Sequence, residues 1–336
     1  IRHPNAFYLR TRQRGMQNWD GKIHYITKTG QFKIGLLPKV YDMCIEMGIK
    51  PKVVDMRQPL PKVSKVVTNI GKYKLRPEQE KAVKAVINNK IGNTPFHIGV
   101  LDYTVNAGKT LIMSSLYLSY KKQLKTLLIT NDSDWLNQAR EEFKQYLPGE
   151  DITFVQGKVL NWSNFTIGMV QSISRNMRFY QKELSQIDMV LVDEADQGGS
   201  KQYQNVITRL FNTRIRIGLS GTIYMSKLAK DRVKNMNLEC FFGKVIAEFK
   251  LKDSIKKGYS TKTVVKMVPG KPWYGNWESD CISYKEIYDD SITNCYTAWL
   301  MAYNRLLWNL NQGRYPALVV CKHIAHCENL YKFFKK

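Results

Sequence analysis

The run Thr104–Thr110, which reads Thr-Val-Asn-Ala-Gly-Lys-Thr, has the residue types of a phosphate-binding loop. It follows an apolar run at 96–101 that predicts a strand, and it opens a helical pattern, which is the setting of such loops. Backbone N–H groups can point at phosphate oxygens, Lys109 can add a positive charge, and Thr110 can offer Mg²⁺ a hydroxyl. Tyr103 stands where the full pattern has glycine, so the run alone is also compatible with a chance Gly-Lys-Thr at a helix start.

A second chemical signal is the acidic run Asp193-Glu194-Ala195-Asp196, which directly follows the apolar residues 189–192. Acids at the end of an apolar strand lie at its carboxyl end, where parallel sheets bind ligands. Asp193 can hold Mg²⁺, and Glu194 can orient and deprotonate an attacking water. The alternative is a solvated acidic turn, yet the run interrupts a strongly basic chain. With the phosphate loop upstream, it predicts a nucleotide-hydrolysing site.

Two weaker signals accompany this pair. Leu75-Arg76-Pro77-Glu78-Gln79 begins a helix before the phosphate loop, and the amide of Gln79 has the donor and acceptor needed to read an adenine edge. Ser220-Gly221-Thr222 follows the apolar run 215–219. Small polar residues at a strand end are usually a turn, so neither run is specific alone.

The elements that must position these residues alternate in type from residue 75 onward. Apolar runs alternate with helical patterns, which predicts a parallel sheet with helices on both faces. Strands buried on both sides are apolar throughout, and Val190–Val192 fits this. The expected strands are 96–101, 126–130, 152–155, 165–170, 189–192 and 215–219.

After about residue 250 the alternation restarts. We expect a strand at 261–268, one long helical stretch at 284–310, and a buried strand at 317–321 followed by a helix. The apolar-aromatic face of the long helical stretch predicts core packing.

Residues 1–60 predict a small α+β domain, with 61–74 as a linker. Asn18–Gly21 predicts a turn between two strands, and 38–48 predicts a helix. The helix would turn Val40, Met43, Cys44 and Met47 inward. Basic and aromatic residues interleave in this domain, so we expect Arg10, Arg12, Arg14 and Lys22 to contact nucleic acid. Trp19 is expected in the domain's own core, with base stacking as the alternative.

The charge balance points to a polyanionic partner. The chain has 336 residues and a net charge of +24, and its hydrophobic content of 43% argues against a disordered chain. Nucleic acid is the expected partner, and a membrane surface or a charge that serves solubility alone are the alternatives. No apolar run reaches the roughly 18 residues of a membrane span, and no signal peptide is recognisable. Scattered cysteines suit a reducing cytoplasm, and the cluster Cys321–Cys327 predicts ordinary packing rather than a metal site.

The order of these motifs resembles that of superfamily 2 helicases and translocases. The series runs Leu-Arg-Pro-x-Gln, Ala-Gly-Lys-Thr, Asp-Glu-Ala-Asp and Ser-Gly-Thr, and the resemblance covers about residues 75–336. Phe242–Phe249 and Lys257-Gly258-Tyr259 are similar to the bridge into the second domain of the XPB-type branch. Asn18–Ile23 and Gly35–Leu37 look like the leading domain of UvsW-like phage helicases.

The resemblance implies a fold and a set of functional residues. The fold is α/β, with a RecA-like parallel sheet domain (P-loop NTPase) at 75–250 and the beginning of a second RecA-like domain at 251–336. ATP and Mg²⁺ are the implied cofactors. Implied roles are ATP binding by Arg76, Gln79, Asn106, Ala107, Gly108, Lys109 and Thr110; catalysis by Lys109, Asp193 and Glu194; Mg²⁺ binding by Thr110 and Asp193; coupling by Ser220 and Thr222; and nucleic-acid binding by Gln171 and Ser172.

Some features depart from related families. The letters Asp-Glu-Ala-Asp suggest a DEAD-box RNA helicase, but those proteins carry Ser-Ala-Thr where this chain has Ser220-Gly221-Thr222, and Ile223 replaces a common proline. The arginine fingers that the resemblance implies have no counterpart in the sequence. We therefore expect the native protein to continue past Lys336, and this segment alone to hydrolyse ATP slowly.

The leading hypothesis is a cytoplasmic ATP-dependent DNA helicase or translocase that remodels branched recombination or replication intermediates, with phage recombination and replication proteins as partners. The first alternative is an RNA helicase or a restriction-type translocase. The second is a nucleic-acid-binding structural or virion protein that keeps an ATPase fold without turnover. The residues alone do not choose DNA over RNA.

Overall fold

The computed structural model describes residues 6–7, 11, 19–120, 123–157, 159–223, 231–262, 283–314 and 318–335. The expected strand at 261–268 lies almost wholly outside the described residues. The chain divides into two compact units, Ile1–Lys262 and Thr263–Lys336.

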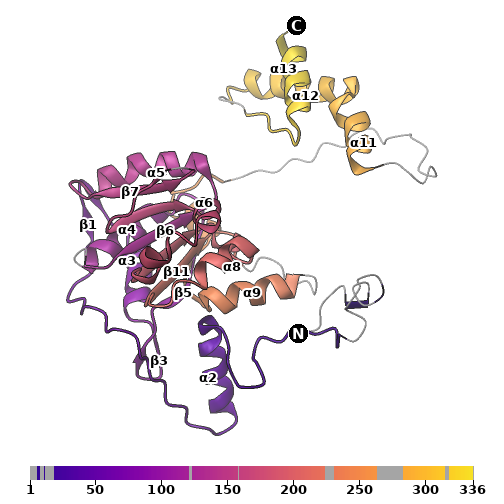
Figure 1. The fold of residues 1–336 in the computed structure, drawn as a ribbon. Coiled ribbons are helices and arrows are strands. Elements are labelled where there is room, and N and C mark those ends of the chain that lie inside the picture. Colours follow the sequence, from indigo (N-terminus) through magenta and orange to yellow (C-terminus); the bar gives the residue numbers. More distant parts are fainter. Residues whose placement is uncertain are drawn as a thin grey trace. The chain divides into compact units, whose positions relative to one another are not determined.

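The first unit is built on one twisted sheet (Figure 1). Among the described residues, eight strands pair in the order β12-β5-β11-β10-β6-β9-β7-β8, and all neighbours are parallel except β7 and β8. This is the predicted RecA-like parallel sheet. Its strands are β5 (Ile98–Tyr103), β6 (Thr126–Thr130), β7 (Ile152–Gln156), β8 (Val159–Leu160), β9 (Phe165–Met169), β10 (Met189–Asp193), β11 (Ile215–Ser220) and β12 (Val245–Phe249).

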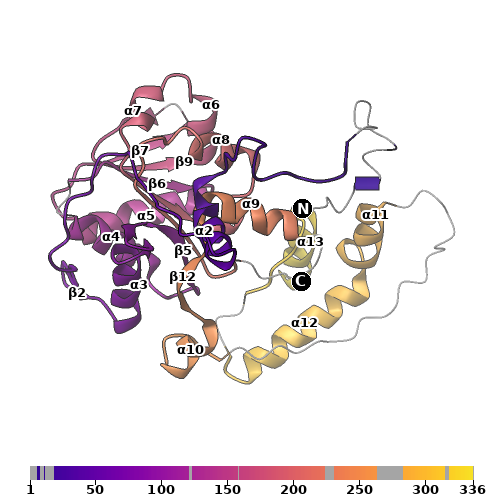
Figure 2. The ribbon, with the colours of Figure 1, turned by 90° about the horizontal axis from the view of Figure 1, so that it is seen from below.

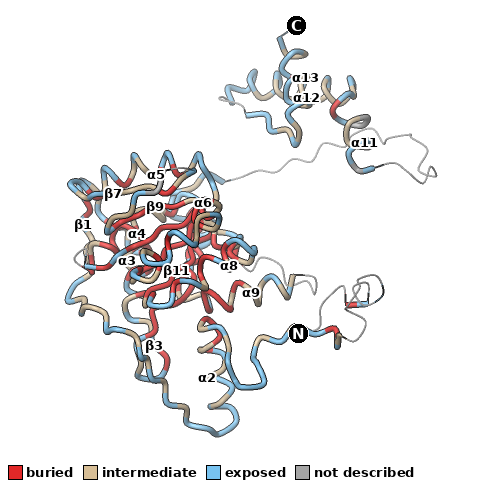
Figure 3. The backbone as a smooth tube through the Cα atoms, in the orientation of Figure 1, coloured by how far each residue is buried: buried red, intermediate tan, exposed pale blue. Residues whose placement is uncertain are grey.

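The helices cover both faces of the sheet because each central strand is apolar on both sides. In β10, Leu191 packs with helices α3, α4 and α5, whereas Val190 and Val192 pack with α6–α9. Figure 3 shows this burial along the central strands. The helices are α3 (Pro77–Ile87), α4 (Lys109–Ser119), α5 (Ser133–Tyr146), α6 (Val170–Arg175), α7 (Gln181–Ser185), η2 (Ala195–Gln197), α8 (Lys201–Ile207), α9 (Arg232–Phe242) and α10 (Leu251–Lys256).

Each of the six strands expected between residues 96 and 219 has a counterpart in the sheet, with ends shifted by at most two residues. Strand β12 was not expected, because residues 242–249 were interpreted only as a bridge between domains. Its backbone pairs with β5, so these residues complete the edge of the first sheet. In the described part of the chain, two small antiparallel pairs lie outside this sheet: β1 (Asn69–Ile70) with β2 (Tyr73–Lys74), and β3 (Lys90–Ile91) with β4 (Thr94–Pro95).

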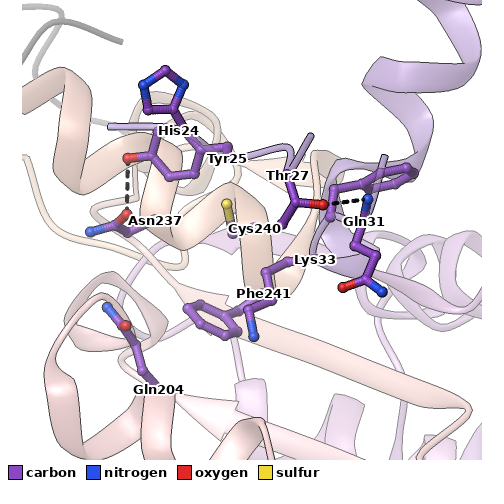
Figure 4. A pocket seen from close by; sticks show the side chains of 10 residues that line it. His24, Tyr25, Thr27, Gln31, Lys33, Gln204, Asn237, Cys240 and Phe241 are labelled. Atoms are coloured by element: carbon purple, nitrogen blue, oxygen red, sulfur yellow. Dashed lines mark hydrogen bonds between the residues drawn. The ribbon is translucent and has the colours of Figure 1, made fainter. Parts of the chain in front are cut away.

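The leading segment packs on the RecA-like domain. The short helix η1 (Ile34–Leu36) lies against α9, and the hydroxyl of Tyr25 donates to Asn237 Oδ1 at 3.0 Å, as Figure 4 shows. Helix α2 (Leu37–Glu46) follows η1 and lies beside α9 (Figure 2). Lys39 of α2 pairs with Glu239 of α9 at 2.7 Å. The lining residues of Figure 4 enclose a pocket of about 410 Å³ along this seam.

One expectation for this segment lies largely outside the described residues, and another is partly wrong. Of the turn expected at Asn18–Gly21 and its two strands, residues 12–18 are not described; after the turn Lys22 takes part in a β-bridge, and a further bridge joins Ile26 to Phe32. The predicted inward face of α2 is only partly correct: Val40 and Cys44 are half-buried, but Met43 and Met47 are exposed, and Leu37 and Tyr41 pack on the core instead. The core beneath α2 lies at β3–β5, which the helix pattern alone could not locate.

The second unit, among its described residues, is helical. It contains α11 (Tyr284–Tyr288), the π-helix η4 (Asp289–Thr293), α12 (Tyr296–Asn311) and α13 (Ile324–Lys335), so the expected single stretch 284–310 is interrupted. Tyr296, Trp299 and Tyr303 pack around Phe333 of α13. Leu307 and Leu310 lie beyond these contacts and are partly exposed, so that end of the expected core face is not covered here.

The expected buried strand at 317–321 is also wrong for its described residues. Leu318 and Val320 are 87% and 82% exposed and belong to no strand. No strand is described between 283 and 335 with which they could pair. None of the described helices of the chain is long and apolar enough to cross a membrane.

Candidate nucleotide-binding site

The loop before α4 has a backbone that its sequence explains. Gly108 is the N-cap of α4 in the left-handed region, at φ 73°, and a Cβ there would lie 2.3 Å from Nε2 of Gln79. Asn106 is also left-handed, at φ 64°, and asparagine tolerates this region better than most residues. The loop therefore turns tightly into the N-terminus of α4, where N–H groups are free to bind anions.

Lys109 lies between this loop and the acidic run. Its Nζ donates to Glu194 Oε1 at 3.0 Å and lies 3.5 Å from Asp193 Oδ1. The parallel strands β5 and β10 flank β11, which brings the ends of both motifs to the same edge of the sheet. Glu194 follows β10 at φ 50°. It and Asn106 are the two non-glycine residues with positive φ in the described chain, and both lie at this site.

The electrostatics of the three side chains are coupled. Burial raises the pKa of Asp193, and the nearby Lys109 ammonium offsets part of this. Burial alone would lower the pKa of Lys109, but the carboxylates of Asp193 and Glu194 raise it above its usual value. The side chain of Lys109 therefore stays protonated, with its ammonium beside two carboxylates.

A pocket of about 400 Å³ opens beside these residues, within the usual size of small-ligand sites. Loop and acidic run both line it, which brings together the predicted Asn106, Ala107, Gly108, Lys109, Thr110, Asp193 and Glu194. Trp135, Gln138, Glu142 and Tyr146 of α5 also line it, and sequence reasoning did not single them out.

The donor set suits a hard divalent cation such as Mg²⁺. Asp193 Oδ1 is buried and lacks a hydrogen-bond partner among the described residues. Thr110 contributes a hydroxyl to the same pocket, and Mg²⁺ prefers carboxylate, hydroxyl, water and phosphate oxygens. The hydroxyl of Tyr203 is likewise buried without a described partner, and its pKa is raised by burial and by the carboxylates of this site.

Arg76 and Gln79 hold the phosphate loop through hydrogen bonds to its backbone carbonyls. The Gln79 amide donates to Ala107 O at 2.8 Å and accepts from the N–H of Arg76 at 2.8 Å. The Arg76 guanidinium donates to Asn106 O at 3.0 Å. In this structure Gln79 is 1% exposed and its amide holds the loop, so any contact with adenine has to use its remaining N–H or the second lone pair of its oxygen.

Tyr103, the departure from the glycine of the full pattern, is the last residue of β5. It is fully buried, and its hydroxyl donates to Glu78 O in the first turn of α3 at 2.7 Å. The side chain thus ties the strand before the loop to the helix that carries Gln79. It does not fill the nucleotide pocket, whose lining begins at Val105.

Ser220 and Thr222 lie beside the acidic run. The Ser220 hydroxyl donates to Asp196 Oδ1 at 3.0 Å and lies 3.2 Å from that of Thr222. The last acid of the run is therefore held by the end of β11, a role for Asp196 that sequence reasoning missed.

Gln171 and Ser172 begin α6 beside the end of β6. Gln171 Nε2 donates to Asn131 O at 3.3 Å, and its Oε1 is buried without a described partner. The Ser172 hydroxyl accepts from the N–H of Gly157 at 2.9 Å. The Ser172 hydroxyl thus serves a hydrogen bond within the fold, whereas Gln171 Oε1 remains an acceptor without a described partner.

The basic residues of the leading segment are only partly described. Arg10, Arg12 and Arg14 lie outside the described residues, whereas Lys22 is exposed. Trp19 is half-buried and its indole donates to Lys22 O at 2.9 Å. The indole N–H thus serves the local turn.

The chain is similar in sequence to known proteins over the segment that carries this candidate site. Residues 72–225 match the family described as "Type III restriction enzyme, res subunit", which spans the loop, the acidic run and Ser220–Thr222. The chain is 22% identical over 228 residues to the ATP-dependent DNA helicase uvsW of Enterobacteria phage T4. That match covers 61% of this chain and 43% of the relative, so the chain matches less than half of the relative's length.

Solved structures give the same fold. A crystal structure of the UvsW helicase from bacteriophage T4 matches 74% of this chain and 89% of its own chain, with 21% identity and a TM-score of 0.57. Another structure of T4 UvsW matches 100% of this chain and 67% of its own, with 20% identity and the same TM-score of 0.57.

Proposed function

We propose that this protein is an ATP-dependent DNA helicase or translocase of superfamily 2, similar to UvsW. Support comes from the family match of residues 72–225, the sequence similarity to uvsW and the fold shared with the UvsW structure. The observation that carries the proposal is the position of Lys109, held between the phosphate loop and the carboxylates of Asp193 and Glu194. A cation, a helix N-terminus and two acids at one sheet edge are the parts that phosphoryl transfer needs.

The residues then have distinct roles. Gly108 lets the loop backbone approach the phosphates, and Lys109 leaves its carboxylate partners to neutralise the β- and γ-phosphates. Asp193 and Thr110 would hold Mg²⁺, which supplies charge stabilisation at the phosphates when bound. Glu194 orients the attacking water and accepts its proton. Ser220 and Thr222, through Asp196, connect this centre to the neighbouring strand end.

Nucleic acid is the proposed partner on two grounds. The net charge of +24 favours a polyanion, and the curated relative is a DNA helicase by name. We propose DNA, in branched recombination, repair or replication intermediates of a phage in its host cytoplasm, as the substrate. We also retain the division into residues 1–60, 61–74, 75–250 and 251–336 as the proposed functional domains.

The test is ATP turnover by the whole protein with and without branched DNA, in two variants. Lys109→Ala removes the phosphate-binding cation, so nucleotide affinity and turnover should both fall. Glu194→Gln keeps shape and hydrogen bonding but removes the proton acceptor, so it should bind ATP while turnover falls by about 10²–10⁴.

Three outcomes would change the proposal. Parental turnover in Glu194→Gln would remove Glu194 from the hydrolytic role. Stimulation by single-stranded or duplex RNA but not by DNA would favour an RNA helicase. ATP binding without turnover under any nucleic acid would favour a structural nucleic-acid-binding protein on an ATPase fold.

A further inference from the structure

The chain segment that leaves the RecA-like domain turns back toward the nucleotide site. After α10, Gly258 adopts φ 73°, and the N–H of Tyr259 donates to Ser254 O at 2.9 Å. This pattern is the left-handed helix end that glycine favours. It places Lys257 and Tyr259 beside the first turn of α3, which carries the residues that support the phosphate loop.

Two contacts join this turn to α3. The Arg76 guanidinium lies over the Tyr259 ring, 4.3 Å from its centroid. Lys257 Nζ pairs with Glu78 Oε2 at 2.7 Å. Phe249 of β12 backs both, because Lys257 lies 5.4 Å from its ring centroid and the Tyr259 ring centroid lies 6.5 Å away.

Glu78 is the centre of this arrangement. It is 6% exposed, and its Oε1 is buried without a hydrogen-bond partner among the described residues, 3.5 Å from Arg76 Nε. A buried carboxylate needs compensating positive charge, which here comes from Arg76 and Lys257. Without Lys257, the Glu78 carboxylate would keep Arg76 as its ion-pair partner. The Arg76 guanidinium would then be drawn toward Glu78.

The same guanidinium touches the phosphate loop. Arg76 Nη2 donates to Asn106 O at 3.0 Å and lies 3.3 Å from where a Cβ of Gly108 would be. Its position therefore fixes the loop backbone on one side and depends on Tyr259 and Glu78 on the other.

We propose that Lys257 and Tyr259 are positioning residues of the nucleotide site, which hold Arg76 against the phosphate loop and thereby couple nucleotide binding to the segment that leads into residues 263–336. This inference rests on the proposed function, since it assumes that the loop binds nucleotide. We call the contacts of Lys257 and Tyr259 with Glu78 and Arg76 the clamp. The coupling is reciprocal: if the intact clamp raises the affinity for nucleotide, bound nucleotide stabilises the clamp by the same factor.

The experiment measures binding of a fluorescent ADP analogue with Mg²⁺ to the whole protein. Tyr259→Leu removes a partly exposed cation–π contact, so the dissociation constant should rise about two- to fivefold. Tyr259→Phe keeps the ring and should match the parent. Lys257→Ala should weaken ADP binding to a similar degree. Lys257→Arg keeps the positive charge and should bind ADP like the parent.

A second readout separates coupling from mere packing. In the parent, ADP should increase the hydrogen-exchange protection of residues 251–262, and in Tyr259→Leu this increase should be lost. The matched control is Trp308→Leu in the other unit, which removes an arginine stack of the same 4.3 Å spacing from Arg305, together with a second contact from Arg314 at 5.0 Å. It should change neither readout.

The outcomes distinguish the two proposals. If the parent binds no nucleotide, the proposed function fails. If the parent binds and Lys109→Ala does not, but Tyr259→Leu and Lys257→Ala bind like the parent, only the clamp is wrong. An equal loss in Tyr259→Phe and Tyr259→Leu would also overturn the role given to the stacked ring.

Discussion

At the scale of single residues, the candidate nucleotide site contains a carboxylate, Asp193, whose burial lowers the stability of the fold. Asp193 is almost fully buried, and its pKa is raised because burial disfavours its charge more than Lys109 compensates. Its ionisation thus destabilises the nucleotide-free protein, which is common where a site is shaped for a ligand.

We predict that Asp193→Asn raises the free energy of unfolding at neutral pH while it abolishes Mg²⁺-dependent turnover. Below pH 3.8, the ordinary pKa that the Asp193 carboxyl has in the unfolded chain, this carboxyl is protonated in both the folded and the unfolded state. Variant and parent should therefore be equally stable there. As pH rises, the unfolded state ionises first and the parent loses stability until its folded pKa is passed. Denaturant unfolding across this pH range checks the sign. A variant less stable than the parent by the same amount at every pH would contradict it.

The sequence predicted the residue types of the site but not all of their partners. Lys109, Asp193 and Glu194 are local signals, because each follows a recognisable strand. Gln79 was expected to face adenine, yet its amide is held by Ala107 O, a contact between distant segments. The stack of Tyr259 on Arg76 has the same origin, and no local pattern encodes it.

At the scale of elements, the N-terminal segment that contains η1 and α2 is attached to the RecA-like domain by a close approach between the backbones of η1 and α9. A Cβ on Gly35 of η1 would lie 2.2 Å from Glu239 O and 2.7 Å from the carbonyl carbon of Cys240, both backbone atoms of α9. Since neither is a flexible side-chain end, Gly35→Ala must push η1 away from α9. We predict a loss of about 1–3 kcal/mol in unfolding free energy, measured by denaturant titration.

Gly199→Ala is the matched control. Its nearest neighbour to an added Cβ is Lys234 O at 3.8 Å, an ordinary contact, and Gly199 is not among the positive-φ glycines. It should leave the unfolding free energy close to the parent value. Equal stability of the two variants would mean that the leading segment is not held by this contact.

Element types were predictable where the pattern was long and the partners lay in the same sheet. The apolar strands around the site met this condition, since each pairs with neighbours of the same kind. Residues 318–321 look equally strand-like but have no described strand to pair with. The inward face of helix α2 was predicted only in part, because the orientation of the helix depends on packing against Ile91 and Phe96, which its own residues do not reveal.

At the scale of the whole molecule, the excess of 52 basic over 28 acidic side chains predicts salt-sensitive binding to nucleic acid. Each lysine or arginine that neutralises a backbone phosphate steepens the log–log dependence of affinity on salt by about 0.7–0.9. We propose that Arg10, Arg12 and Arg14 bind phosphates in this way, together with the exposed Lys22.

Neutralising Arg10, Arg12 and Arg14 together should therefore weaken binding to forked DNA and flatten its salt dependence by roughly 0.7–0.9 for each phosphate that is no longer neutralised. ADP affinity should not change, because the described phosphate site is formed by the RecA-like domain. The control replaces the exposed Lys81, Lys84 and Lys144 on α3 and α5, which removes the same charge elsewhere. If only the net charge matters, both variants flatten the slope equally. A parental slope in the arginine variant, with parental melting, would remove the leading segment from the binding surface.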